Sequence, residues 1–265
     1  MKTRYPKEFV WSLGSLLAAV VVVHAIWSVW VRPNAQAVLT VQAEAMRKDP
    51  NFVPERSMFV IMKDWEQESC VILMIWAIAI IVLKNRTTRR EGEIMDGDPV
   101  RIPEGMRILP EDTREYVRQL ESLPGDQQQS LTVRAAKAAL SRFGATRNVQ
   151  DVSEAGHAVC AAEAERLDSE LSMVRYIAWA IPAIGFIGTV RGIGDALAEA
   201  HKAVTGDISG VTEGLGVAFN STLVALLLSL VLMFLLHQLQ LAQERLVLDA
   251  ETYLDNRVLR NLQVR

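Results

Sequence analysis

Two threonines lie inside apolar helical stretches, where a hydroxyl group could take part in ion transfer. Thr189 belongs to the segment IPAIGFIGTVRGIGDA, and Thr222 belongs to GLGVAFNSTLVA. A hydroxyl in such a place can simply donate to a carbonyl one turn earlier in its own helix, or it can line a polar path. Because both threonines accompany small residues, and because Asn220 and Ser221 precede Thr222, we expect these four side chains to border a narrow ion path.

Small residues recur at spacings of three and four in the same two segments. This spacing puts them on one side of each helix, where the backbone of a neighbouring helix can approach closely. The pattern is typical of helices that pack inside a membrane. We expect this packing role for Pro182, Gly185, Gly188, Gly192, Gly214 and Ala218.

Charged residues mark the expected outer end of this path. Arg191 and Asp195 are four residues apart, so they can form an ion pair on one helix or a charged collar at the mouth. Asp207 and Glu213 follow in a short loop and would face the same compartment. No Asp or Glu lies in the middle of a predicted span, so we expect a partner protein to supply the titratable carboxylate.

The sequence lacks the usual motifs of enzymes and cofactor-binding proteins. There is no glycine-rich phosphate loop, no array of Cys and His with metal spacing, and no Ser, His and Asp in a hydrolase order. His157 and Cys160 lie one turn apart, but two ligands do not make a zinc site. The net charge is −3, with no basic segment interleaved with aromatic residues. We therefore expect no enzyme activity, no cofactor, no metal and no nucleic-acid partner.

The elements that would position these residues are transmembrane helices. Half of the residues are hydrophobic and 22% are charged, so the apolar residues must be gathered in blocks. A helix needs about 20 apolar residues to cross a bilayer. The apolar runs at 9–31 and 214–237 are long enough. Those within 70–84 and 174–198 are shorter and could be buried helices of a soluble core, but a basic cluster follows the one and the other can continue to residue 197 if other helices shield it from lipid. We therefore predict four spans, at residues 9–31, 70–84, 174–198 and 214–237. A signal peptide is disfavoured for the first span, because Trp27, Trp30 and Val31 extend it without a cleavage site.

Basic residues predict the orientation of these spans. They precede the first span, follow the second and follow the fourth, which is typical of cytoplasmic flanks. We expect residues 1–8, a helical domain at 85–173 and a C-terminal helix at 238–265 to lie in the cytoplasm. Residues 32–69 and 199–213 would then lie in the periplasm. The prediction is an all-α, multi-pass protein of the bacterial inner membrane with both termini in the cytoplasm.

The parts outside the spans are predicted to be helical as well. We expect a helix at 35–47 that ends at Pro50 and Pro54, an irregular connector that includes Gly92, and helices at 111–123 and 129–143. A third helix, 149–173, would continue into the third span until Pro182 perturbs it. His24 lies inside the first span, where bonding to a neighbouring helix is a simpler role for it than proton relay.

The two segments that contain Thr189 and Thr222 resemble a known family. PAIGFIGTVRGI, followed by GLGVAFNSTLVALLLSLVLMF and a charged helix, is similar to the core of the MotA/TolQ/ExbB proton-channel family. The resemblance implies a homopentamer whose third and fourth spans surround a dimer of a single-span, ExbD/TolR/MotB-like partner. It also implies that this partner carries a membrane Asp that Thr189 and Thr222 face, and that the proton motive force drives a motor of which this chain is the stator subunit.

Several alternatives remain open at this point. Val217 stands where TonB-type relatives tend to have an acidic residue, and Arg191 stands at a position that is often apolar, so sodium is an alternative to the proton. The four spans are similar to the flagellar branch, whereas the GTV motif is closer to ExbB and TolQ. A non-conducting membrane scaffold would need the same small residues but no polar lining. A solute transporter is disfavoured, because the first two spans do not resemble the last two.

Overall fold

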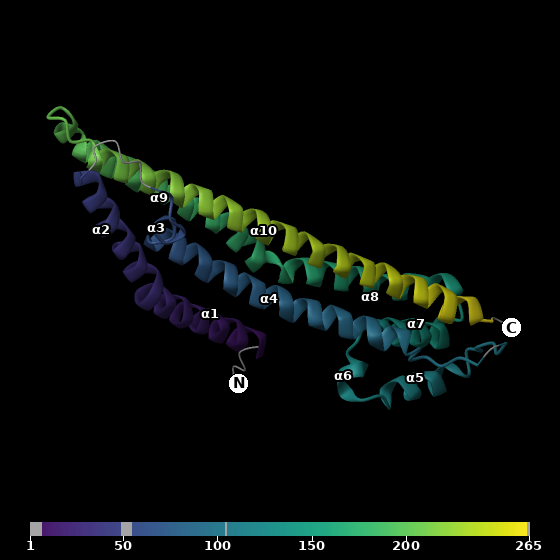
Figure 1. Cartoon of the computed structure of the whole chain (residues 1–265). Coiled ribbons are helices and arrows are strands. Elements are labelled where there is room, and N and C mark those ends of the chain that lie inside the picture. Colours follow the sequence, from purple (N-terminus) through teal and green to yellow (C-terminus); the bar gives the residue numbers. More distant parts are fainter. Residues whose placement is uncertain (1–6, 49–54, 104, 264–265) are drawn as a thin grey trace, which may run out of the picture. The chain divides into compact units, whose positions relative to one another are not determined.

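The computed structural model describes residues 7–48, 55–103 and 105–263, and these are predominantly helical (Figure 1). In this described part, the pairing of extended residues is confined to one isolated bridge, between Ile108 and Leu262. The chain divides into two compact units. Unit 1 comprises Met1–Ile81 and Met173–Leu236, and unit 2 comprises Val82–Ser172 and His237–Arg265. The division falls inside two long helices, α4 and α10.

Unit 1 contains the helices of the predicted spans. They are α1 (Lys7–Ile26), the π-helical turn η1 (Trp27–Val31), α2 (Arg32–Lys48), the short α3 (Met58–Ile61), and the first parts of α4 (Trp65–Asp96) and α10 (Ser209–Tyr253), together with α9 (Ser172–Ala203). Among the described residues, four helical stretches are long and apolar enough to cross a membrane: Trp11–Met46, Trp65–Asp96, Val149–Ala203 and Ser209–Asn261. The predicted fold class, an all-α polytopic membrane protein, is confirmed.

A π-helical turn joins α1 to α2 without ending the helix. Pro33 has no N–H to donate to the carbonyl of Val29, and the N–H of Arg32 bonds to Trp27 O, five residues earlier. The side-chain amide of Asn34 donates to Trp30 O at 2.7 Å. The π-helical turn therefore lets the helix continue through Pro33. It also lets the indole of Trp27 donate to Met62 O at 2.8 Å.

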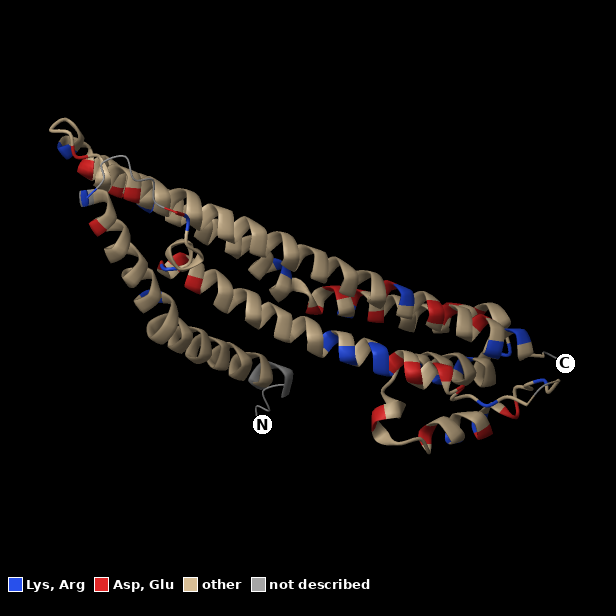
Figure 2. Cartoon of the chain, viewed as in Figure 1, with Lys and Arg blue, Asp and Glu red and all other residues tan. Residues whose placement is uncertain are grey.

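Charged residues are absent from long stretches of α9 and α10 in unit 1 (Figure 2). On α4, the apolar stretch is followed by a group of basic residues, where the sequence has Lys84, Arg86, Arg89 and Arg90. Segregation of this kind is what a helix needs to cross a bilayer and end at a charged surface.

Unit 2 is a helical domain with a core of its own. It contains α5 (Thr113–Glu121), α6 (Gly125–Gln128), α7 (Leu131–Thr146), α8 (Val149–Glu170), and the C-terminal turns η2 (Leu254–Val258) and η3 (Leu259–Asn261). Ser130 caps α7 by accepting from Val133 N, and Asn148 caps α8 by accepting from Gln150 N. The core gathers buried side chains from α7, α8, α10, η2 and the connector after α4, among them Phe143, Leu140, Val152, Ile108 and Leu254.

Two local predictions need correction. The connector was expected to be irregular at Gly92, but α4 continues to Asp96. Glycine costs a helix only about 1 kcal/mol, and a carboxylate oxygen of the preceding Glu91 accepts from Leu131 N at 2.9 Å, which ties this part of α4 to α7. The helix expected at 149–173 is interrupted at Leu171, whose N–H bonds three residues back to Asp168 O.

The remaining expectations are met in part. α9 continues through Pro182. The helix expected at 35–47 forms part of α2, while Pro50 and Pro54 lie outside the described residues, as do residues 1–6 of the predicted N-terminal segment.

Candidate functional site

The hydroxyls of Thr189 and Thr222 lie in direct hydrogen-bond contact between α9 and α10. The Thr189 hydroxyl also lies 3.1 Å from Ala218 O and 3.3 Å from Gly185 O. The Thr222 hydroxyl lies 3.2 Å from the same Gly185 carbonyl. Each hydroxyl has one proton to donate and can also accept. The two hydroxyl protons therefore have more possible acceptors than they can bind at once. Each hydroxyl can exchange one acceptor for another by rotation of its side chain, without movement of the backbone.

Glycine and alanine allow the two helices to approach this closely, and α9 and α10 lie side by side (Figure 1). A Cβ atom added at Gly192 would lie 2.5 Å from Ala218 N and from Gly214 O. One added at Gly214 would lie 2.6 Å from Ala196 N. Gly185 meets Ala225 in the same way, and Pro182 lies inside α9 three residues before Gly185. These residues hold the two threonines at contact distance.

The two polar residues before Thr222 have different surroundings. Ser221 is buried, donates to Val217 O at 2.8 Å and accepts from the Gln67 amide at 3.4 Å. Asn220 is half-buried on the neighbouring face of α10. Ser221 therefore connects α10 to the first turn of α4.

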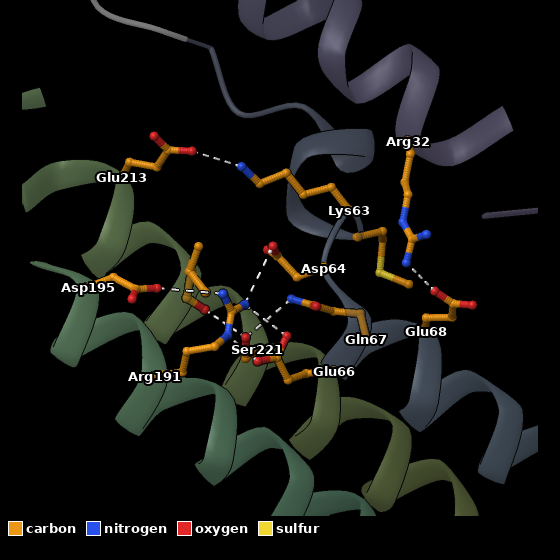
Figure 3. A network of polar contacts seen from close by, with 12 residues as sticks. Arg32, Lys63, Asp64, Glu66, Gln67, Glu68, Arg191, Asp195, Glu213 and Ser221 are labelled. Atoms are coloured by element: carbon orange, nitrogen blue, oxygen red, sulfur yellow. Dashed lines mark hydrogen bonds and ion pairs between the residues drawn. The ribbon is translucent and has the colours of Figure 1, made fainter. Parts of the chain in front are cut away.

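The main partner of Arg191 is Glu66, from the first turn of α4 (Figure 3). Arg191 Nε lies 2.7 Å from Glu66 Oε1, and Arg191 Nη2 lies 3.0 Å from Glu66 Oε2. Paired contacts of this kind are the strong form of an arginine–carboxylate bond. The sequence favoured Asp195 as the partner, but its carboxylate is 3.6 Å from the guanidinium, as is that of Asp64.

Asp64 lies just before α4 and is half-buried. Burial raises the pKa of this carboxyl above its ordinary value, while the neighbouring charges of Lys63 and Arg191 act in the opposite direction. Asp64 is therefore harder to ionise than an exposed aspartate.

The other two charges predicted for the outer mouth bind elsewhere. Glu213 forms an ion pair with Lys63 at 3.1 Å (Figure 3). Asp207 accepts from the backbone and the hydroxyl of Ser209, the first residue of α10, and these hydrogen bonds lower the pKa of Asp207. The structure thus brings Arg191 and Asp195 together, while Asp207 caps a helix.

His24 is bound to Glu68, another acidic residue that the sequence placed outside the membrane. His24 Nδ1 lies 2.7 Å from Glu68 Oε1, and Arg32 Nη2 lies 2.6 Å from Glu68 Oε2. Glu68 is only 8% exposed. This cluster joins α1 and α2 to α4, in agreement with a His bonded to a neighbouring helix.

Sequence reasoning missed Glu66, Gln67 and Glu68 because they precede the apolar part of α4 and were assigned to a periplasmic segment. The charge of Arg191 on an apolar helix was a signal that a carboxylate lies near it, but the sequence offered Asp195, four residues later, as that partner. Among residues 7–48, 55–103 and 105–263, no group of three or more His, Cys, Asp or Glu side chains could hold a metal ion.

Comparison with protein families matches residues 127–252 to the model of the MotA/TolQ/ExbB proton channel family. This segment, just under half of the chain, is similar to the MotA/TolQ/ExbB proton channel family. The predicted resemblance is confirmed, and with four apolar helices it identifies a multi-pass membrane protein of a channel family. Comparisons with curated proteins and with solved structures found no match.

The MotA/TolQ/ExbB match includes α7, α8, α9 and most of α10, and with them Thr189, Thr222 and the small residues between these helices. Residues 64–68 and His24 lie outside it. Glu66, the main partner of Arg191, and Glu68, the partner of His24, therefore come from a part of the chain to which the family model does not extend.

Proposed function

We propose that this chain is the channel-forming stator subunit of a membrane motor driven by the proton motive force. Five copies would surround a dimer of a single-span, ExbD/TolR/MotB-like partner that carries a membrane Asp. Protons, or alternatively sodium ions, would pass between the subunits and the partner, and the partner would deliver mechanical work. The complex would lie in the bacterial inner membrane with both termini of this chain in the cytoplasm.

The contact between Thr189 and Thr222 is the observation that carries this proposal. The hydroxyls come from the two helices that the family match covers. Their protons have several alternative acceptors, so either hydroxyl can turn to donate to a carboxylate brought close by a partner. A carboxylate in a medium of low dielectric is stabilised strongly by such a donor.

The outer faces of α9 and α10 support an assembly in a membrane. They expose large apolar side chains, including Phe186, Ile187, Phe219, Leu223 and Leu230. Contiguous apolar surface of this kind is rare on soluble monomers and fits lipid or other helices. The basic residues after the apolar part of α4 and along the end of α10 favour a cytoplasmic location for unit 2.

Proton flux through the native complex tests the proposal. The complex would be copurified with its single-span partner and reconstituted into vesicles that contain a pH-sensitive dye. We expect Thr189→Ala combined with Thr222→Val to reduce flux strongly, and Thr212→Ala, which removes an exposed hydroxyl from α10, to leave it unchanged. Unchanged flux in the double variant, with the complex intact, would remove both threonines from the pathway.

The second candidate function is a non-conducting scaffold that organises envelope partners. The glycine and alanine contacts between α9 and α10 alone would serve it. The two functions differ in their energy requirement, because a scaffold would keep its activity after collapse of the proton gradient. Identification of the copurified partner would also separate them, since the motor requires a single span with a membrane Asp.

A further inference from the structure

Glu66 is a buried carboxylate that the proposed threonine path does not use. Its side chain has 0% exposure and its charge is balanced by Arg191. An ionised carboxylate held in the interior is tolerated only with such a partner. A disturbance of this pair would therefore change the protonation of Glu66.

Glu66 lies close to the threonine site. A Cβ atom added at Gly188, the residue before Thr189, would lie 3.1 Å from Glu66 Cγ and 2.5 Å from the Ser221 hydroxyl oxygen. Ser221 in turn precedes Thr222 and accepts from Gln67. Glu66 and Ser221 therefore face the same point on α9, one residue before Thr189.

Gln67 leaves one acceptor in this cluster without a donor from the protein. Its side chain is fully buried, and its Oε1 atom has no hydrogen-bond partner among the protein groups. Figure 3 shows this side chain directed from α4 toward Ser221 and Arg191. A buried acceptor without a donor is costly, and a water molecule is the usual remedy. The same water could exchange protons with a neighbouring carboxylate.

Arg191 has alternative partners when it leaves Glu66. Asp64 and Asp195 each lie 3.6 Å from its guanidinium, which has five N–H donors. A small rotation would replace the contacts with Glu66 by contacts with these two aspartates. Glu66 would then be buried without a cation, a state that favours its protonated form.

We propose that Glu66 is a proton-exchanging residue of this subunit and that Arg191 controls its protonation. The inference rests on the proposed function and adds a carboxylate from this chain to the path. A hydronium ion would give one proton to a Glu66 oxygen and leave as water. When Arg191 returns, Glu66 would release that proton to the next acceptor toward Thr189 and Thr222. Arg191 stays protonated throughout.

The charges around Glu66 favour the entry of cations. Arg191 and Asp195 lie on α9, Asp64 and Lys63 in the segment before α4, and Glu213, which pairs with Lys63, on α10, while Glu68 follows Glu66 on α4 (Figure 3). Glu68 is engaged by His24 and Arg32. The other groups comprise two cations and four carboxylates, including Glu66, so the cluster is net negative and would attract protons.

Infrared titration of the purified full chain in phosphatidylcholine vesicles tests the exchange without the partner. We expect a protonated-carboxyl band that titrates with pH, shifts in heavy water, is lost in Glu66→Gln and persists in Glu154→Gln, which changes an exposed carboxylate of α8 outside this cluster. Arg191→Gln should also change this band, because it removes the guanidinium that contacts both carboxylate oxygens of Glu66. A spectrum in which neither Glu66→Gln nor Arg191→Gln changes any band overturns the proposal.

Glu66→Gln leaves Arg191 without its main partner, so Glu66→Asp provides a second variant that keeps the charge. It should retain a titrating band at an altered midpoint. A band that is identical in wild type and Glu66→Asp belongs to another group and also overturns the proposal.

Flux through the native complex separates this inference from the proposed function. General acid–base groups contribute about 100-fold or more, so Glu66→Gln should reduce proton flux by about that factor while Glu154→Gln leaves it unchanged. Wild-type flux in Glu66→Gln, with loss of flux in the threonine variants, refutes the role of Glu66 alone. The reverse pattern refutes the role of the threonines and supports Glu66.

Discussion

The Ser229 hydroxyl of α10 donates a hydrogen bond to the Ala178 carbonyl of α9 over 3.1 Å. Ala178 lies four residues before Pro182, and proline has no N–H to complete the helical bond to that carbonyl. Both Ser229 and Ala178 are buried. The serine therefore supplies the missing donor, which explains how Pro182 can lie inside an apolar helix without leaving a buried acceptor unpaired.

Ser229→Ala should destabilise the chain by about 1–3 kcal/mol, the penalty of a buried acceptor without a donor. In a Pro182→Ala background the same substitution should cost less, because the alanine that replaces the proline would donate its own N–H to the Ala178 carbonyl. Thermal unfolding of the four variants in detergent measures this coupling. Equal costs in both backgrounds would show that Ser229 does not compensate for the proline.

Gly192→Ala should separate α9 from α10 and destabilise the chain by about 1–3 kcal/mol, as overpacking usually does. The added Cβ would meet backbone atoms of Ala218 and Gly214, which cannot yield as a flexible side chain can. Gly194 is the matched control on the same helix, since a Cβ atom there meets nothing within 4 Å. Gly194→Ala should be neutral or stabilise by up to about 1 kcal/mol. Similar melting temperatures for the two variants would contradict this packing.

Asp64 should make the chain less stable as the pH rises above 3.8, the ordinary pKa of this carboxyl group. Burial raises its pKa in the folded chain above the ordinary value of 3.8. The folded state then binds more protons than the unfolded state between the two values, so stability falls as the pH rises through this window. Asp64→Asn should flatten the dependence of unfolding on pH there and stabilise the chain at neutral pH. A pH dependence of unfolding that is steeper in Asp64→Asn than in the wild type would contradict this prediction.

Tyr253→Phe should destabilise unit 2 by about 1–3 kcal/mol, because it removes a hydroxyl that serves two partners. Tyr253 donates to Asp98 at 2.6 Å and accepts from Val100 N at 3.3 Å. Asp98 has a positive φ of 46°, so this turn needs support from outside. Limited proteolysis at 97–101 measures its opening. Tyr116→Phe is the control, since that hydroxyl donates to the Met106 sulfur, a weak acceptor, at 3.5 Å.

Helix packing could be predicted from the sequence, but the partners of buried charges could not. The spacing of Gly185, Gly188 and Gly192 is local information, because the period of the helix places them on one face. Glu66 and Arg191 are 125 residues apart, and nothing in the composition near Glu66 shows that α4 brings it against α9. The burial of Glu66 depends on tertiary contact, so it became visible only in the structure.

The hydroxyls of Thr189 and Thr222 should be coupled in stability as well as in function. They contact each other and share the Gly185 carbonyl. Valine has a similar shape but no hydroxyl, so each single Thr→Val variant leaves the other hydroxyl with fewer partners. Residues in one hydrogen-bond network show coupling energies of about 0.5–3 kcal/mol. A double-mutant cycle of Thr189→Val and Thr222→Val, measured by thermal unfolding, should therefore give a combined cost that differs from the sum. The cycle of Thr189→Val with Thr212→Val is the control and should be additive, because Thr212 bonds to Ser209 O in its own helix.

Thr→Ser at position 189 or 222 keeps the hydroxyl and should preserve both stability and flux. Additive costs at Thr189 and Thr222, or loss of flux in the serine variants, would indicate that the methyl groups and not the hydroxyls determine the role of this pair.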